Sequence, residues 1–172
     1  RILEDIGLRV GIIGQPDINS DVDVKRLGEP KLFWGVSGGS IDSMVSNYTA
    51  TKKFRNDDDY TPGGKNNKRP DRATLVYTNL IRRYFKNTAP IVLGGIEASL
   101  RRLTHYDYWS NTLRKPILFD SKADYMVYGM GEQAIIDLGL YLRDGKDVRT
   151  IAGLCYISKE PVKEYVQIPS HK

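Results

Sequence analysis

The chain has 172 residues, of which 40% are hydrophobic and 27% charged, so it can bury the core of one globular domain. No stretch approaches the roughly 18 uninterrupted apolar residues of a membrane helix, and the opening residues lack the sections of a signal peptide; we therefore expect a soluble cytoplasmic protein. The formal net charge of +5 is a mild excess, compatible with RNA or another anionic partner without identifying one.

Thiol and metal chemistry are restricted by the composition. Cys155 is the single cysteine, so the chain forms no internal disulfide and cannot by itself hold zinc or an iron–sulfur cluster. Its place in the apolar run 151–157 predicts a buried structural thiol rather than a nucleophile. Since His105 and His171 are the only histidines, we expect no histidine-based metal site. We predict no metal ligand and no catalytic residue in this chain.

The first fifty residues predict short helices and strands in alternation. The predicted elements are a helix at Arg1–Ile6 ended by Gly7, a strand at Arg9–Gly14, a helix at Asp21–Leu27, a strand at Lys31–Val36, and a helix at Ile41–Thr49 capped by Ser40 or Asp42. Residues 51–71 follow as a long basic loop that is too polar to bury. Asp71 is expected to cap the next helix, whose apolar side carries Leu75, Leu80, Ile81 and Phe85.

The second half of the chain continues the alternation. The predicted elements are strands at Pro90–Gly95 and Asp124–Gly129, helices at Glu97–Leu103 and Gly131–Arg143, and a final hairpin of Leu154–Ser158 with Tyr165–Ile168. This order predicts an α/β fold with three layers, in which a doubly wound, mostly parallel sheet of flavodoxin-like or cobalamin-binding-domain-like type carries helices on both faces. We expect a Rossmann-like domain at 1–150 that lacks its first strand, and a hairpin and linker at 151–172.

Three predicted strands end in small-residue turns. The carboxyl ends of parallel strands gather at one edge, where ligands bind in such folds, and glycine allows the backbone to approach a ligand closely. The candidate ligand-facing residues are Gly38, Gly39, Ser40, Gly94, Gly95, Glu97, Gly129, Gly131 and Glu132. The alternative is that these are tight turns and helix caps without a ligand. For Glu97 and Glu132, each in the first turn of a helix, capping is the default interpretation.

The loop 51–71 and the aromatic segment 101–109 allow a different function. Cations interleaved with aromatic rings can hold single-stranded nucleic acid, but four nearby aspartates reduce the local excess of charge. An ordinary solvated loop, or one that docks on a neighbouring domain, is the favoured interpretation. The basic residues concerned are Lys52, Lys53, Arg55, Lys65, Lys68, Arg69 and Arg72. For segment 101–109 we expect the rings to pack between domains rather than on bases.

Several long phrases resemble the N-terminal region of the YgiQ-type radical-SAM protein family. They are DSMV (42–45), NYTA (47–50), YTPGG (60–64), RPDRA (69–73), VLGGIEASLRRLTHYDYW (92–109), and the stretch 120–132, which opens with DSKAD and closes with YGMGE. The likeness runs in order over roughly residues 7–169.

The resemblance implies an architecture larger than this chain. The N-terminal region of the family is similar to the cobalamin-binding-like Rossmann domain that precedes many radical-SAM barrels, here without the cobalt-ligating histidine motif. The barrel that follows carries a C-x-x-x-C-x-x-C loop, which holds a 4Fe-4S cluster that binds and cleaves S-adenosylmethionine. Those cysteines have no counterpart here, so the cluster and S-adenosylmethionine are expected only in a full-length parent.

The leading functional hypothesis is therefore an accessory domain. It would cover the barrel of the same polypeptide and shape the access of an unknown substrate, without catalysis of its own. One alternative is a nucleic-acid-binding module that works through the basic loop. The other is a flavodoxin-like domain that binds a flavin or nucleotide at the glycine edge.

Overall fold

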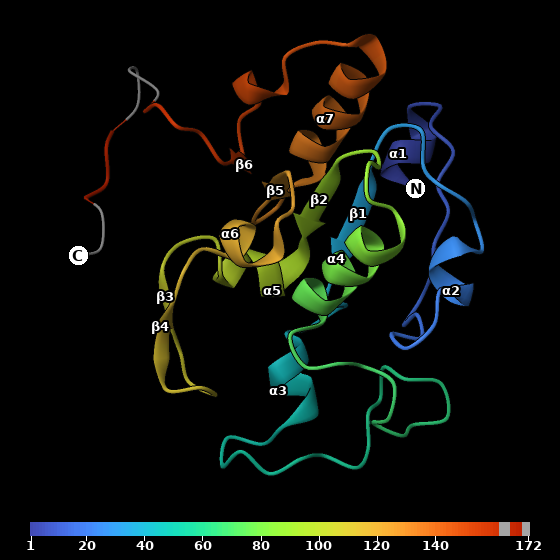
Figure 1. The fold of residues 1–172 in the computed structure, drawn as a ribbon, viewed down its shortest axis with the longest axis vertical. Helices are drawn as coiled ribbons and strands as arrows, with labels where there is room; N and C mark the ends of the chain where they lie inside the picture. The colour runs from blue at the N-terminus through green and yellow to red at the C-terminus, as the bar shows by residue number, and fades with distance from the viewer. Residues whose placement is uncertain (162–165, 170–172) are drawn as a thin grey trace.

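The computed structural model of the chain describes residues 1–161 and 166–169. Its centre is a four-stranded sheet with the order β1-β2-β5-β6, and a separate two-stranded hairpin lies beside it (Figure 1). The strands of the main sheet are β1 (Trp34–Ser37), β2 (Ile91–Gly94), β5 (Tyr125–Val127) and β6 (Leu154–Tyr156). The first three are parallel and β6 is antiparallel to β5, which confirms the mostly parallel α/β fold.

The central strand β2 is apolar along its length because both of its faces are covered. Ile91 and Leu93 pack into one hydrophobic cluster, and Val92, which points to the opposite face, packs into the other. Helix α4 (Ala73–Tyr84) and helix α6 (Ile117–Ser121) contribute to the first cluster, and helix α7 (Glu132–Asp144) contributes to the second. The molecule is therefore a three-layer α/β domain (Figure 1).

The remaining elements are short and surround the sheet. They are α1 (Ile2–Asp5), α2 (Val22–Lys25), α3 (Ser43–Asn47), α5 (Gly95–Leu100), the hairpin strands β3 (His105–Asp107) and β4 (Thr112–Arg114), and a 3-10 turn at Val148–Thr150. The longest helix, α7, ends at Gly145 with φ +66°, as the sequence predicts. Helix α1 and the residue Leu8 pack near Gly139 of α7, where a side chain would meet Leu8 at 2.9 Å.

The strand predicted at Arg9–Gly14 is wrong, because these residues form no strand in the structure. Ile12 is 82% exposed, so this apolar run contributes little to the core. A strand needs a neighbouring strand to satisfy its backbone groups, and the main-sheet pairings of β1 within the described residues are to β2 alone. The two glycines at positions 11 and 14 add an entropic cost to any extended pairing.

The predicted C-terminal hairpin is only partly within the described residues. Its first arm contains β6, which pairs with β5 and so extends the main sheet beyond residue 150. Its second arm begins at Tyr165, outside the described residues, and residues 166–169 carry no strand. In the part of the chain that the structure describes, no helix combines the length and the apolar character needed to cross a membrane.

Candidate functional site

A cavity of about 350 Å³ lies at the carboxyl ends of the three parallel strands. Five of the predicted edge residues line it, namely Gly94, Gly95, Gly129, Gly131 and Glu132. The rest of the wall comes from β1, β2 and β5, including Ser37 and Val127, and from one residue each of α1 and α7. The turns after β2 and β5 therefore meet at one site, as expected for the edge of a parallel sheet.

The absence of a side chain has a different explanation at each of these glycine positions of the cavity. Gly95 and Gly129 have φ values of +80° and +64°, which disfavour any side chain. A Cβ at Gly131 would lie 2.2 Å from Val127 Cγ1, so the start of α7 packs directly on β5. Gly94 differs, because its φ is −155° and a Cβ there would meet nothing within 4 Å. At Gly94 neither the backbone nor packing requires a missing side chain, and the space stays open.

The other predicted edge residues do not line the cavity. Gly38 is buried, and a Cβ on it would lie 2.5 Å from Oε2 of Glu97. Gly39 has φ +104° and completes the turn, while Ser40 is exposed. The turn after β1 therefore supports the carboxylate of Glu97 instead of contributing to the cavity wall.

Glu97 holds two helices together through one buried carboxylate. It is 1% exposed; its Oε2 accepts the backbone N–H of Ser43 at 2.8 Å, and its Oε1 accepts that of Thr74 at 2.9 Å. These donors lie in the first turns of α3 and α4, where N–H groups have no intrahelical partner. Glu97 lies in the first turn of α5 and does have a capping role, but the N–H groups that it accepts belong to two other helices. Glu132, in contrast, is exposed at the cavity rim.

Asp42 and Ser43 complete the junction of α3 with its neighbours. Asp42 is the cap of α3, and its Oδ1 accepts the N–H groups of Met44 and Val45 at 2.9 and 3.3 Å. Its second oxygen forms an ion pair with Arg101. Ser43 Oγ accepts the N–H of Ala73 at 3.0 Å. The start of α3 is thus tied to α4 and to the end of α5.

The capping role predicted for Asp71 is wrong. Its carboxylate accepts hydrogen bonds from Asn47 Nδ2 at 2.9 Å and from the Tyr48 hydroxyl at 2.8 Å. The residue that precedes α4 is Arg72, in the left-handed conformation with φ +51°, and its side chain makes no capping bond. The free N–H groups of α4 are instead accepted by Ser43 and Glu97. The Asp71 carboxylate also raises the pKa of Tyr48.

The loop 51–71 has a buried polar centre, which corrects the interpretation that it is too polar to bury. Asp58 and the side chain of Arg69 are almost fully buried and form an ion pair at 2.9 Å. Burial opposes ionisation of Asp58, but hydrogen bonds from Thr61 and Tyr60 and the nearby Arg69 lower its pKa. Charges enter this interior because each has a partner.

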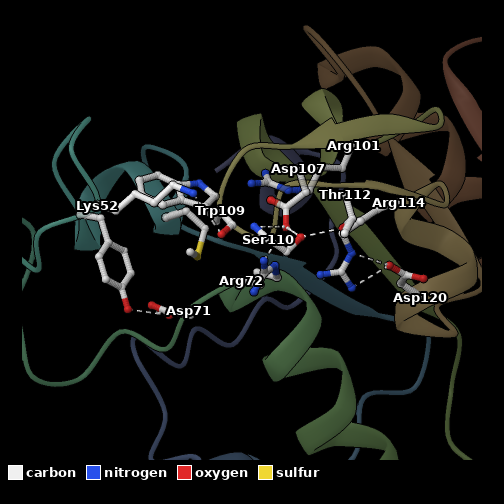
Figure 2. A network of polar contacts seen from close by, with 12 residues as sticks. Lys52, Asp71, Arg72, Arg101, Asp107, Trp109, Ser110, Thr112, Arg114 and Asp120 are labelled. Atoms are coloured by element: carbon white, nitrogen blue, oxygen red, sulfur yellow. Dashed lines mark hydrogen bonds and ion pairs between the residues drawn. The ribbon is translucent and has the colours of Figure 1, made fainter.

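The aromatic rings of the loop and of segment 101–109 pack on one another. Neighbouring ring centroids lie 5.6 Å apart for Phe54 and Tyr48, 5.3 Å for Tyr48 and Trp109, and 5.4 Å for Trp109 and Tyr108. Lys52 Nζ lies 4.6 Å from the centre of the Tyr108 ring and donates to the Trp109 carbonyl at 3.4 Å (Figure 2). This packing attaches the loop to Tyr108 and Trp109 in the turn between β3 and β4.

Asp107 is the centre of the polar network in Figure 2. It is 4% exposed, and it accepts hydrogen bonds from Arg72 Nη2 at 2.6 Å and from the Ser110 hydroxyl. Burial alone would raise the pKa of Asp107, but Ser110 and Arg72 together lower it to about 2. Nearby, Arg114 donates to Asp120 at 2.9 Å. The hairpin is therefore fixed to the start of α4 by an ion pair.

These contacts occupy many of the cations proposed for nucleic-acid binding. Arg69 and Arg72 form ion pairs within the domain. Lys52 contacts Trp109, and Arg55 Nε donates to the Tyr48 carbonyl at 3.1 Å. The other three cations, Lys53, Lys65 and Lys68, are exposed. Because four of the seven are engaged within the domain, the structure does not favour a nucleic-acid interface at the loop.

The residues present do not fit an iron–sulfur cluster. A cluster requires several thiolates, and Cys155 is the only cysteine of the chain. It is partly buried, and burial raises the pKa of its thiol. Among residues 1–161 and 166–169, no group of three or more His, Cys, Asp or Glu side chains is placed to hold a metal ion.

Fold and edge together define a doubly wound α/β domain with a ligand-sized cavity at the carboxyl ends of its strands. Residues 1–172 match the family described as Radical SAM N-terminal, and the chain belongs to this family. The family assignment agrees with the YgiQ-type resemblance of the sequence. No solved structure matches the chain.

Three similar proteins are much longer than this chain. A UPF0313 protein of Fusobacterium nucleatum is 61% identical over 170 residues, which are 98% of this chain and 30% of the relative. A UPF0313 protein of Thermotoga maritima is 53% identical, over 96% of this chain and 30% of the relative. A UPF0313 protein of Clostridium botulinum is 51% identical, over 99% and 27%. The chain thus spans about 30% of the length of these relatives.

The first prediction concerns the Glu97 carboxylate. In Glu97→Gln an amide NH₂ must face one of the two N–H donors, so we expect the free energy of unfolding to fall by about 2–3 kcal/mol. Urea unfolding followed by circular dichroism measures this. Glu132→Gln, the same change at an exposed glutamate, should stay within about 0.5 kcal/mol. Equal effects of the two substitutions would contradict the clamp.

The second prediction compares two glycines with unstrained φ. Gly38→Ala places a methyl group against the Glu97 carboxylate, so we expect a loss of about 1–3 kcal/mol in unfolding free energy. Gly94→Ala places the same group in open space and should change stability by less than about 1 kcal/mol. Thermal unfolding of both variants tests the difference, and a Gly38→Ala variant as stable as Gly94→Ala would refute the close approach.

The third prediction follows from the low pKa of Asp107. Because its pKa falls from 3.8 to about 2 in the folded state, its ionised form stabilises the fold above about pH 4. That stabilisation is lost as the pH falls towards 2. In Asp107→Asn, urea unfolding between pH 5 and pH 2 should show a smaller loss of stability than in the unmodified protein. The exposed Asp59→Asn is the control and should keep the full loss.

Proposed function

We propose that this chain is the N-terminal accessory domain of a cytoplasmic radical-SAM enzyme, whose barrel carries the 4Fe-4S cluster and binds S-adenosylmethionine. Family membership and the 30% share of the relatives' length support this proposal. A cluster needs several thiolates and this chain has one cysteine, so in this proposal the cluster ligands belong to the barrel. In this view the domain includes β6, which pairs with β5, and the chain after β6 leads towards the barrel.

The cavity at the carboxyl edge is the observation that carries the functional part of the proposal. Its volume of about 350 Å³ is in the range of small-ligand sites. We propose that this edge looks towards the mouth of the barrel and shapes the access of the substrate. The open space at Gly94 supports this, because neither backbone conformation nor packing accounts for the missing side chain.

The polar groups of the cavity can orient a substrate without chemical change. Glu132 is exposed in the first turn of α7, and Ser37 contributes a hydroxyl at the end of β1. A carboxylate and a hydroxyl can bind hydrogen-bond donors of a substrate, while Val127 and Ile135 offer apolar contact. In this proposal the chain binds the substrate and excludes water from it, and the reaction takes place in the barrel.

The fourth prediction tests this edge in the full-length protein, reconstituted anaerobically with iron and sulfide. Gly94→Leu fills the cavity without backbone strain, so we expect the formation of 5′-deoxyadenosine from S-adenosylmethionine to change by about fivefold or more. The iron and sulfide content of the variant should stay unchanged.

Gly14→Leu is the matched control, because a Cβ at Gly14 would also meet nothing within 4 Å and its φ is likewise unstrained, but Gly14 lies outside the cavity wall. It should react like the unmodified protein. Unchanged 5′-deoxyadenosine formation in Gly94→Leu would reject a role of the edge in access, and a full-length protein that assembles no cluster would reject the enzyme class.

A further inference from the structure

A second cavity, of about 220 Å³, lies between α3, α5 and the β3–β4 hairpin. The side chains of Val45, Leu100, Tyr106 and Tyr108 line it, and each is about half exposed or more. Leu113 adds to this surface, because it lies directly opposite Tyr106 across the hairpin. We call these five residues the hairpin face. Apolar side chains from three separate elements rarely converge on solvent unless another surface covers them.

Within the part of the chain that the structure describes, this side of the hairpin is left without cover. Tyr106 and Leu113 are both 58% exposed and form a cross-strand pair on the same face. A two-stranded hairpin is only marginally stable without packing against another element. The ion pair of Arg72 with Asp107 anchors its other side to the domain. The structure thus holds the hairpin in place while leaving its apolar pair in solvent.

The charges around this second cavity indicate which class of partner fits. The carboxylates and the arginine that line it are already paired, Asp42 with Arg101 and Asp107 with Arg72, whereas Nε2 of His105, which also lines it, is buried without a hydrogen-bond partner among the described residues. A nucleic acid would require free cations here. A protein surface fits the observed combination of an apolar centre with paired charges at its rim. The cavity can accept one apolar side chain as an anchor.

The hairpin face continues into the edge described above. Ile96 and Leu100 lie one turn apart on α5 and are both exposed. The first residue of this helix, Gly95, lines the edge cavity, and its last residue, Leu100, lines the second cavity. One partner that covers α5 would therefore contact both sites.

We infer that the hairpin face is the docking surface for the part of the same polypeptide that follows this domain in the longer relatives. About 70% of the length of those relatives lies outside the region that this chain matches, which provides a partner large enough to cover the face. In Figure 1 residues 157–161, which follow β6, leave the sheet to the left, and the β3–β4 hairpin also lies to the left of the sheet. This inference rests on the proposed function, in which that partner is the barrel.

Hydroxyl-radical footprinting of the full-length protein tests the inference. For Tyr106, Leu100 and Leu113 we expect labelling at least about tenfold slower in the native than in the urea-unfolded protein, because docking removes them from solvent. If these side chains stay about half exposed, as they are in the isolated domain, labelling should be only about twofold slower in the native than in the unfolded protein. Tyr60 and Leu27, each 55% exposed, are the matched residues outside the face and should show the twofold value.

A variant adds a second measurement. Leu113→Asp places a charge in the proposed contact, so labelling of Tyr106 should rise by about fivefold, whereas Leu27→Asp should leave Tyr106 protected. If labelling of Tyr106 and Leu113 in the native protein is only about twofold slower than in the unfolded protein, the inference is overturned. Protection that disappears on hundredfold dilution would also overturn it, because the partner would then be a second copy of the chain.

The outcome is separable from that of the proposed function. If the hairpin face is free while Gly94→Leu still alters 5′-deoxyadenosine formation, only the docking surface is refuted. If the face is protected while Gly94→Leu has no effect, the docking surface is supported and the role of the edge in access is refuted.

Discussion

The carboxylate of Glu97 is the constraint on which the carboxyl edge depends. It is buried between the first turns of α3 and α4 and accepts one backbone N–H from each. A buried carboxylate is costly unless every oxygen is hydrogen-bonded, and here two helix N-termini supply the donors. Because Glu97 itself lies in the first turn after β2, the segments that follow β1, β2 and the basic loop are all fixed relative to one strand end. Gly38 is part of the same device, since a side chain there would displace the carboxylate.

The elements that the sequence predicts well are those whose signal is local. The apolar run of β2 and the amphipathic pattern of α7 with its terminal Gly145 lie where the sequence places them. The strand expected at Arg9–Gly14 fails because strand formation depends on a neighbour, and the described pairing of β1 in the main sheet leaves this run unpaired. The capping role predicted for Asp71 is wrong for a related reason. Its position before α4 fits a cap, but Asn47 and Tyr48 compete for the carboxylate from 24 and 23 residues away.

In the candidate site, too, some features have a local signal in the sequence and others depend on residues far along the chain. That glycine turns gather at one edge follows from the geometry of parallel strands, and the turns after β2 and β5 do line one cavity. Sequence could not separate these turns from the one at Gly38, which serves the carboxylate of a residue far along the chain. The ion pairs of Asp58 with Arg69 and of Asp107 with Arg72 were missed as well. Aspartates and arginines close together in a polar loop indicate solvation as readily as burial, so no local signal distinguishes the two.

The distribution of charged and apolar groups also indicates what the domain is built to contact. Arg69 of the loop 51–71 is directed inward onto Asp58, and Arg72 at the start of α4 is directed onto Asp107 of the hairpin. Such buried ion pairs define a position more than they stabilise it. Tyr106 and Leu113, in contrast, point to solvent. A surface that evolved to bind phosphates would show the reverse arrangement, with free cations outside. Fixed ion pairs inside and apolar side chains outside instead give a rigid face of defined shape. Such a face is suited to a protein partner, and because α5 belongs to both the face and the edge cavity, a partner held there would also border the cavity.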